Sequence, residues 1–262
     1  MNDLTGSDVE IRPASTLILL RDRPAGYKGI YYEIFMLKRN LNSDFIGGAF
    51  VFPGGGVMQS DFDEKFYTRC KNFSHGDNDL KFKVNSGSLA YFIAAIRETF
   101  EEAGILVGLC EHNKRIEFKK YRDMLNAKQI SFLDFMEKED IYLDLSKIVY
   151  FSHWTTPVGP PRRYSTRFFV TRVEPNFELS HDNGETVESR WINPALALEL
   201  SEAGEIEIIF PTVKNICRLL NFSQSDDLLA GLMELSDIKE IVPRIDVNGN
   251  ELKILIPGDE GY

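Results

Sequence analysis

The stretch RETFEEAG, residues 97–104, places Glu98, Glu101 and Glu102 within five residues of one another. Like charges one helical turn apart repel each other. A divalent cation such as Mg²⁺ offsets this repulsion, because it takes oxygen ligands from carboxylates and from substrate phosphates. The stretch therefore predicts a metal site, and a solvated helix that merely displays charge is the alternative.

The residues around this stretch predict a helix over 88–104. Ser88 is a typical N-cap residue and Gly104 a typical C-cap residue. At about 100° per residue, the three glutamates share one face of this helix. The opposite face carries an apolar stripe that consists of Leu89, Ile93, Ile96, Phe100 and Ala103. We therefore expect one face to pack on a core and the other to gather oxygen atoms.

Composition bounds the class of protein. The chain has 262 residues, of which 43% are apolar, so it can bury a substantial core. The net charge of −10 argues against a nucleic acid polymer as a partner. The three scattered cysteines indicate reduced thiols. No segment has the length and apolarity of a membrane span. The first ten residues do not resemble a signal peptide. We therefore expect a cytoplasmic protein that does not bind membranes.

The order of predicted elements indicates a single α+β domain over residues 1–262. We expect strands at 14–22, 31–39, 49–57, 147–157, 163–174 and 185–192, with a turn between the first two. Residues 58–87 are expected to form a loop with one short helix, and 114–139 to be helical. The C-terminal extension, from about residue 195, is expected to contain helices at 194–205, 211–222 and 226–235. A hairpin should follow, turning at Asn248-Gly249.

The sequence resembles the signature of the Nudix hydrolases. That signature has a glycine, five residues, a glutamate, seven residues, and then a run that matches residues 97–105, with Thr99 as a mild departure. Gly55, in the segment FPGGG, occupies the glycine position. From Gly55 to Arg97 is 42 positions where the signature has 14, so the box holds 28 extra residues. The glutamate position before the arginine holds Leu89, and counting forward from Gly55 gives Asp61 as a substitute.

The insertion lies at a position that resembles the insertion found in one branch of this family. That branch has an expanded box and includes peroxisomal coenzyme A diphosphatases and bacterial relatives. A related branch carries a short coenzyme A signature. Its spacing is matched here by Arg39, Gly48 and the segment 52–55. Asn40 and Asp44 stand where that signature has a serine and a second arginine. The resemblance implies an α/β/α sandwich with a mixed central sheet, an insertion at 58–87 and a C-terminal extension of helices and a hairpin.

The resemblance also implies the site residues and the cofactor, which is Mg²⁺ or Mn²⁺. The implied metal ligands are the carboxylates of Glu98, Glu101 and Glu102 with a backbone carbonyl at Gly55 or its neighbour. Glu101, Glu102 and Glu185 are the candidate catalytic groups, with Glu188 as the alternative to Glu185. Three residues of the motif are expected to have structural roles: Arg97, Gly54 and Gly104. Arg97 is expected to brace the glycine loop through an ion pair.

Several arginines are candidate ligands for substrate phosphate. Arg162, Arg163 and Arg167 form a cationic cluster whose planar groups match phosphate oxygens, and Arg39 joins them by the coenzyme A spacing. Pairing with surface carboxylates is the alternative for the cluster. The implied function is metal-dependent hydrolysis of a diphosphate in coenzyme A or an acyl-coenzyme A. The alternatives are a pyrophosphatase acting on ADP-ribose, a nucleotide sugar or a dinucleotide, and a non-catalytic Nudix-fold sensor of such a ligand. The resemblance also suggests a homodimer.

Overall fold

The first strand decides how the two layers of helices are arranged. The computed structural model describes residues 9–40, 47–111, 115–174, 186–248 and 251–262. In strand β1 (Ile11–Tyr27), Leu17 and Leu19 belong to one buried cluster, whereas Ile18 and Leu20 belong to another. Because successive side chains of a strand point to opposite faces, the sheet is apolar on both faces and needs cover on each.

The central sheet is mixed and has eight strands. Its order is β10-β7-β8-β1-β2-β3, with β4 paired to β1 and β9 paired to β2. β1 runs parallel to β8 and antiparallel to β2 and β4. The other strands of this sheet are β2 (Ile30–Arg39), β3 (Phe50–Val51), β4 (Gly54–Gly56), β7 (Val149–Thr155), β8 (Arg163–Arg172), β9 (Thr186–Ile192) and β10 (Glu240–Ile241).

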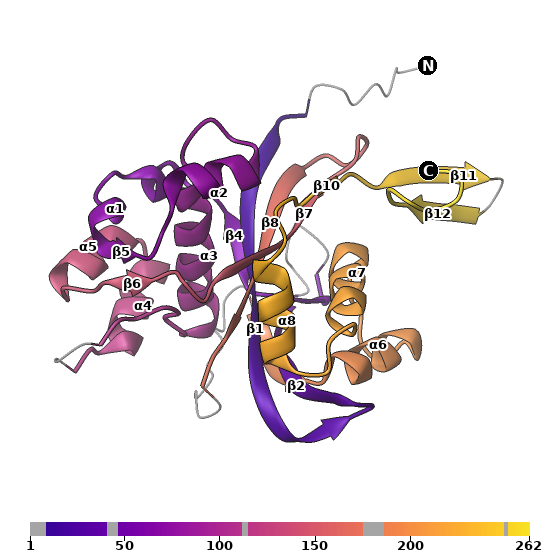
Figure 1. Ribbon diagram of the computed structural model, residues 1–262, viewed down its shortest axis with the longest axis horizontal. Coiled ribbons are helices and arrows are strands. Elements are labelled where there is room, and N and C mark those ends of the chain that lie inside the picture. The colour runs from indigo at the N-terminus through magenta and orange to yellow at the C-terminus, as the bar shows by residue number, and fades with distance from the viewer. Residues whose placement is uncertain (1–8, 41–46, 112–114, 175–185, 249–250) are drawn as a thin grey trace.

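Helices cover both faces of the sheet (Figure 1). The first layer is built around α3 (Ser88–Ala103), and the second layer comes from the C-terminal third of the chain. The first layer also contains α1 (Phe66–Arg69), α2 (His75–Phe82), α4 (Phe118–Asn126) and α5 (Phe132–Lys138). The second layer contains α6 (Pro194–Glu202), α7 (Phe210–Leu219) and α8 (Ser225–Met233).

Two local features differ from the sequence-based expectation. β1 extends to Tyr27, so the turn to β2 is confined to Lys28 and Gly29, whose φ angles are 50° and 77°. Both residues adopt the left-handed region, as tight hairpin turns require. The predicted strand 49–57 is divided into β3 and β4, which pair with different partners. Its Pro53 has no N–H to donate to a ladder, which suits the break.

The insertion is more ordered than the predicted loop with one short helix. It contains a 3₁₀ helix η2 (Gln59–Phe62), α1, α2 and the strand β5 (Cys70–Lys71), which pairs in parallel with β6 (Leu143–Asp144). Phe82, at the end of α2, is 2% exposed. Its ring centroid lies 4.5–5.8 Å from the rings of Tyr91, Phe92, Tyr150 and Phe169. This aromatic cluster fixes the end of the insertion onto α3 and the sheet.

The C-terminal hairpin follows the expected pattern. β11 (Arg244–Asn248) and β12 (Glu251–Leu255) pair antiparallel from Arg244↔Leu255 to Asn248↔Glu251. The hairpin lies apart from the two helical layers (Figure 1). The predicted turn residue Gly249 is outside the described residues. Within the described ranges, no helix combines the length and apolarity that a membrane crossing requires.

Replacing Phe82 should destabilise the fold through loss of the aromatic cluster. We expect Phe82→Ala to lower the free energy of unfolding by about 3–5 kcal/mol, because a large buried ring is removed and a cavity remains. Leu80→Ala is the matched control, since Leu80 lies on the same helix and is 77% exposed. Urea denaturation of both variants tests this. Equal stability of the two variants would contradict the anchoring role of Phe82.

Candidate functional site

Helix α3, which carries the glutamates, is buried on nearly all sides. The apolar stripe is buried as expected, and burial extends beyond it to Ala94, Ala95 and Arg97. The side chains of Glu98 and Glu101 are 14% and 20% exposed. Helices η2, α2 and α4 pack against α3 (Figure 1), which leaves these two carboxylates only partly exposed.

The two ends of α3 are held in different ways. Gly104 has a φ of 73° and donates its N–H to the Phe100 carbonyl oxygen, as a C-cap glycine does. Ser88 is not the N-cap: the helix begins at Ser88 and Gly87 precedes it. The N–H of Ser88 donates instead to Asp79 Oδ1 of α2, at 3.0 Å. A side chain from the insertion therefore supplies the acceptor that the local sequence was expected to supply.

The glycine strand β4 lies directly against the glutamates. The N–H of Gly54 donates to Glu102 Oε2 at 2.9 Å. A Cβ added at Gly55 would lie 2.5 Å from Glu98 Cδ, and one added at Gly54 would lie 2.5 Å from the Ser15 carbonyl oxygen of β1. Glycine at 54 and 55 is therefore required because backbone and carboxylate approach each other without room for a side chain.

Arg97 connects the two halves of the motif. Its Nε and Nη2 each donate to one oxygen of Asp61, both at 3.0 Å, and Nη2 also donates to the Gly56 carbonyl oxygen at 3.0 Å. Its Nη1 donates to Glu98 Oε1 at 2.8 Å and to Glu101 Oε2 at 3.2 Å. Asp61, at the position counted forward from Gly55, therefore holds Arg97 in a two-point contact.

Burial and charge act in opposite directions in this cluster. Burial alone would lower the pKa of Arg97, but Asp61, Glu98 and Glu101 raise it above its ordinary value. Burial raises the pKa of Glu101 to about 7, with Glu98 adding to the rise and Arg97 opposing it. The cluster thus has more negative charge than one guanidinium offsets, which favours the addition of a cation.

The donor set fits an oxygen-preferring cation such as Mg²⁺ or Mn²⁺. No group of three or more His, Cys, Asp or Glu side chains is already gathered as a metal site within the described residues. Mg²⁺ needs no such group, because it commonly binds through one or two carboxylates and keeps waters and substrate phosphate as its other ligands. Glu98 and Glu102 lie beside the glycine strand and offer this kind of partial shell.

The back of the helix is held by residues that the sequence did not indicate. Arg122 of α4 is 6% exposed. It donates from Nε to the Glu101 carbonyl oxygen at 2.8 Å and from Nη2 to the Glu102 carbonyl oxygen at 2.6 Å. Asn126 Nδ2 also donates to the Glu101 carbonyl oxygen, at 3.2 Å. No local pattern pairs residues about 20 positions apart on two helices, so the sequence carries no signal for this contact.

The structure does not gather the four predicted phosphate-binding arginines into one open cluster. Arg167 is 5% exposed, donates to the Phe82 carbonyl oxygen and lies 4.2 Å from the Tyr91 ring centroid. Arg163 is 9% exposed and donates to the Thr156 carbonyl oxygen at 3.1 Å. Both side chains make contacts within the fold, and their role in binding substrate phosphate stays a prediction. Arg162 is exposed before β8 and Arg39 ends β2, and their roles in binding stay predictions.

The candidates for a general base have different outcomes. Glu185 lies outside the described residues, so its role stays a prediction. Glu188 of β9 forms ion pairs with Arg190 and Lys38. Its carboxylate is therefore already engaged by two cationic side chains of the sheet, and a role as general base stays a prediction.

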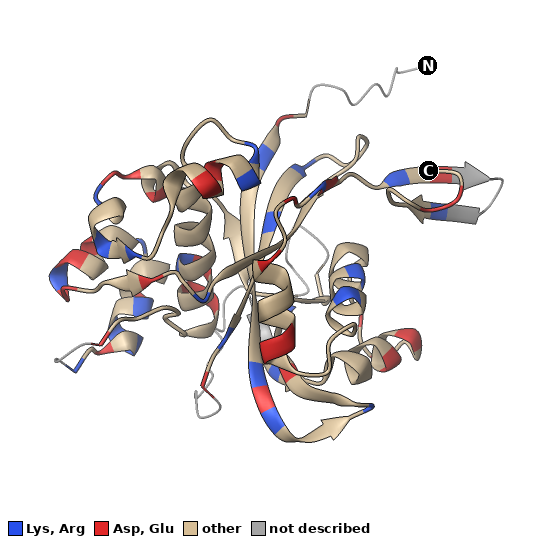
Figure 2. Ribbon diagram, in the orientation of Figure 1, with Lys and Arg blue, Asp and Glu red and all other residues tan. Residues whose placement is uncertain are grey.

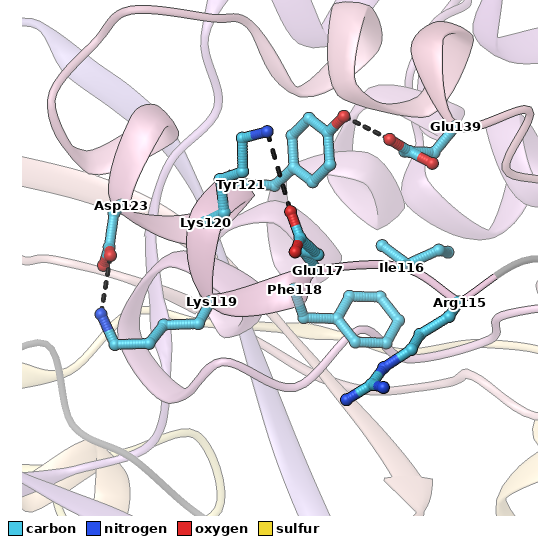
Figure 3. A pocket seen from close by; sticks show the side chains of 9 residues that line it. All are labelled: Arg115, Ile116, Glu117, Phe118, Lys119, Lys120, Tyr121, Asp123 and Glu139. Atoms are coloured by element: carbon cyan, nitrogen blue, oxygen red, sulfur yellow. Dashed lines mark hydrogen bonds and ion pairs between the residues drawn. The ribbon is translucent and has the colours of Figure 1, made fainter.

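One hollow on the surface is not lined by Glu98, Glu101 or Glu102. It has a volume of about 850 Å³ and is lined by residues 115–121, Asp123 and Glu139. Figure 3 shows two ion pairs in it, between Lys119 and Asp123 at 2.7 Å and between Lys120 and Glu117 at 3.7 Å. Acidic residues of α3 are confined to its C-terminal half (Figure 2), and none of them lines this hollow.

Comparison with known proteins agrees with this geometry. Residues 67–219, more than half of the chain, match the family model of the NUDT19 Nudix domain. The chain belongs to this Nudix family. It is 28% identical over 271 residues to an acyl-coenzyme A diphosphatase NUDT19 of Xenopus laevis, covering 88% of this chain and 71% of that protein. The Homo sapiens protein of the same name is 26% identical, covering 92% of this chain and 74% of that protein.

A solved structure confirms the Nudix fold. The crystal structure of a NUDIX hydrolase from Alicyclobacillus acidocaldarius superposes with a TM-score of 0.67 and 22% sequence identity. The superposition covers 85% of this chain and 97% of that one. The expected α+β Nudix sandwich, with its mixed sheet between helical layers, is therefore confirmed.

Adding one methyl group at Gly55 should displace the Glu98 carboxylate. We expect Gly55→Ala to weaken Mn²⁺ binding by about 10-fold or more, in line with the loss seen when the support of a ligand is removed. Gly56→Ala is the matched control, because a Cβ there meets nothing within 4 Å. Mn²⁺ titration followed by electron paramagnetic resonance measures both. Equal affinity in the two variants would contradict the contact.

His153 should make the protein less stable in acid. Burial lowers its pKa to about 4, assisted by Arg167 and Lys83 and opposed by Glu240, and its Nε2 lies 2.7 Å from Ser165 Oγ. In the unfolded state the histidine takes up its proton near pH 6.5. The free energy of unfolding therefore falls by roughly 1–2 kcal/mol as the pH falls from 7 to 5.

The variant His153→Gln should lose less stability over this pH range than the wild type. His75→Gln, at an exposed position of α2, should behave as the wild type does. Urea denaturation at pH 5 and pH 7 measures the difference. A wild-type loss that persists unchanged in His153→Gln would show that other groups cause it.

Proposed function

We propose that this protein hydrolyses the diphosphate linkage of coenzyme A or of an acyl-coenzyme A. The observation that carries the proposal is the set of Glu98, Glu101 and Glu102 against the glycine strand, in a chain whose relatives are named acyl-coenzyme A diphosphatases over 88–92% of its length. In the proposed reaction, water attacks one phosphorus of the diphosphate and the bond to the bridging oxygen breaks. The products are 3′,5′-ADP and phosphopantetheine, or its acyl derivative.

We propose Glu98 and Glu102 as the residues that hold Mg²⁺ or Mn²⁺, with Glu101 and a carbonyl oxygen of Gly55 beside them. When bound, such a cation supplies charge that offsets the diphosphate and lowers the pKa of the attacking water. The protein's own contribution is to fix the carboxylates. Arg97 holds Glu98 and Glu101 from one side, and the N–H of Gly54 holds Glu102.

The proposal also assigns the acid–base groups and the cellular context. Glu101 and Glu102 are proposed as the acidic groups nearest the reacting water, and Glu185 as a further base. Arg39 and Arg162 are proposed to bind substrate phosphates. The described residues include three cysteines without a disulfide, Cys70, Cys110 and Cys217, and we propose a cytoplasmic location on that basis. A homodimer stays a prediction from the resemblance.

The variant Glu102→Gln should lose activity without losing its fold. The amide oxygen of glutamine still accepts from the Gly54 N–H, but the negative charge for the cation is gone. We expect turnover to fall by about 10²-fold or more, as it does when an interaction made with the reacting charge is removed. Glu202→Gln, an exposed glutamate at the end of α6, is the control for loss of a carboxylate.

The assay is hydrolysis followed by mass spectrometry with Mg²⁺ and with Mn²⁺. The substrates are coenzyme A, acetyl-coenzyme A, ADP-ribose, NADH, diadenosine polyphosphates and nucleotide sugars. Release of 3′,5′-ADP by the wild type and by Glu202→Gln, but not by Glu102→Gln, supports the proposal. Preferred cleavage of ADP-ribose, a dinucleotide or a nucleotide sugar would replace the proposed substrate. Metal binding without any hydrolysis would favour a ligand sensor.

A further inference from the structure

The last turn of α3 carries two of the proposed functional glutamates and also contains the backbone groups that a helix leaves unpaired. The final four carbonyl oxygens of a helix have no partner within it. Gly104 satisfies the carbonyl of Phe100, and those of Glu101 and Glu102 receive the Arg122 guanidinium. Arg122 therefore contacts the main chain of the same two residues whose side chains form the site.

We propose that Arg122 is a positioning residue for the metal-binding carboxylates, which acts by fixing the backbone of Glu101 and Glu102. This inference rests on the proposed function for its catalytic consequence. Arg122 lies on α4, outside the motif that carries the glutamates. Its Nε and Nη2 both donate to main-chain oxygens, so these two contacts act on the backbone of the helix.

The geometry shows why helix capping alone is an incomplete account of Arg122. A glycine C-cap already ends α3, and a neutral donor is enough to satisfy one carbonyl. A guanidinium that is 6% exposed loses most of its hydration, so its place in the interior needs several strong contacts. Its planar fork spans two successive carbonyls and fixes their relative orientation, which a single donor does not do.

The effect on the carboxylates follows from the contacts on the other side of the helix. Glu102 reaches the Gly54 N–H at 2.9 Å, and Glu101 reaches Arg97 Nη1 at 3.2 Å. The last turn is thus held from the front by β4 and Arg97 and from the back by Arg122, with Asn126 as a second donor to Glu101. Without the rear contact, the last turn can fray and carry both carboxylates away from the glycine strand.

The test compares two arginines with the same chemistry at different places. Arg218 of α7 is partly buried, less deeply than Arg122, and also donates to a main-chain carbonyl, that of Phe151, at 2.8 Å. We expect Arg122→Gln to weaken Mn²⁺ binding by about 10-fold, with a matching fall in turnover at saturating substrate, as for loss of a residue that orients a ligand. Arg218→Gln should lose similar thermal stability and keep wild-type Mn²⁺ affinity. Arg122→Lys, which keeps the charge without the fork, should recover less than half of the lost affinity.

Mn²⁺ affinity is measured by titration followed by electron paramagnetic resonance, which needs no substrate. Wild-type Mn²⁺ affinity in Arg122→Gln, or an equal loss in Arg218→Gln, would overturn the inference. If Arg122→Gln does not fold, Asn126→Ala removes the exposed second donor to Glu101 and should weaken Mn²⁺ binding, by less than Arg122→Gln is expected to. An unchanged affinity there would then overturn the proposal. Wild-type protein that binds Mn²⁺ but cleaves no substrate would refute the proposed reaction and leave this test intact.

Discussion

The contact between the guanidinium of Arg97 and the carboxylate of Asp61 is the interaction on which the site depends. Both groups are nearly inaccessible, at 3% and 2% exposure, so neither is stable there without the other. A buried charge without its partner costs about 3–5 kcal/mol. Arg97 also donates to the Gly56 carbonyl and to Glu98, which ties the strand, the insertion and the helix to one side chain.

This arrangement gives the insertion a part in the site. Asp61 belongs to the insertion, yet it makes the contact that joins Gly56 to α3. Further along the insertion, Asp79 accepts from the first N–H of α3 and Phe82 packs on its N-terminal half. The insertion therefore supports α3 at its first residue, on its N-terminal half and at Arg97.

The sequence predicted the contacts that depend on short-range pattern. The spacing of Glu98, Glu101 and Glu102 and the glycines at 54 and 55 pointed to one cluster, and the Nudix fold is confirmed. The first strand and the C-cap at Gly104 also follow from local chemistry. The burial of Ala94, Ala95 and Arg97 on α3 did not follow, because it depends on packing against segments that are distant in the sequence. The same holds for Arg122, for Asp79 in place of Ser88, and for Arg167, which an aromatic cluster encloses.

Asp61 and Asp79, at two separate places in the insertion, both contact α3. The entropy of closing a loop grows only with the logarithm of its length, at about 0.6 kcal/mol for each doubling. Segments added between Asp61 and Asp79 would therefore leave both ends anchored and the carboxylates in place. By this reasoning, we expect length changes at exposed turns of this segment to disturb the carboxylates less than replacement of either aspartate.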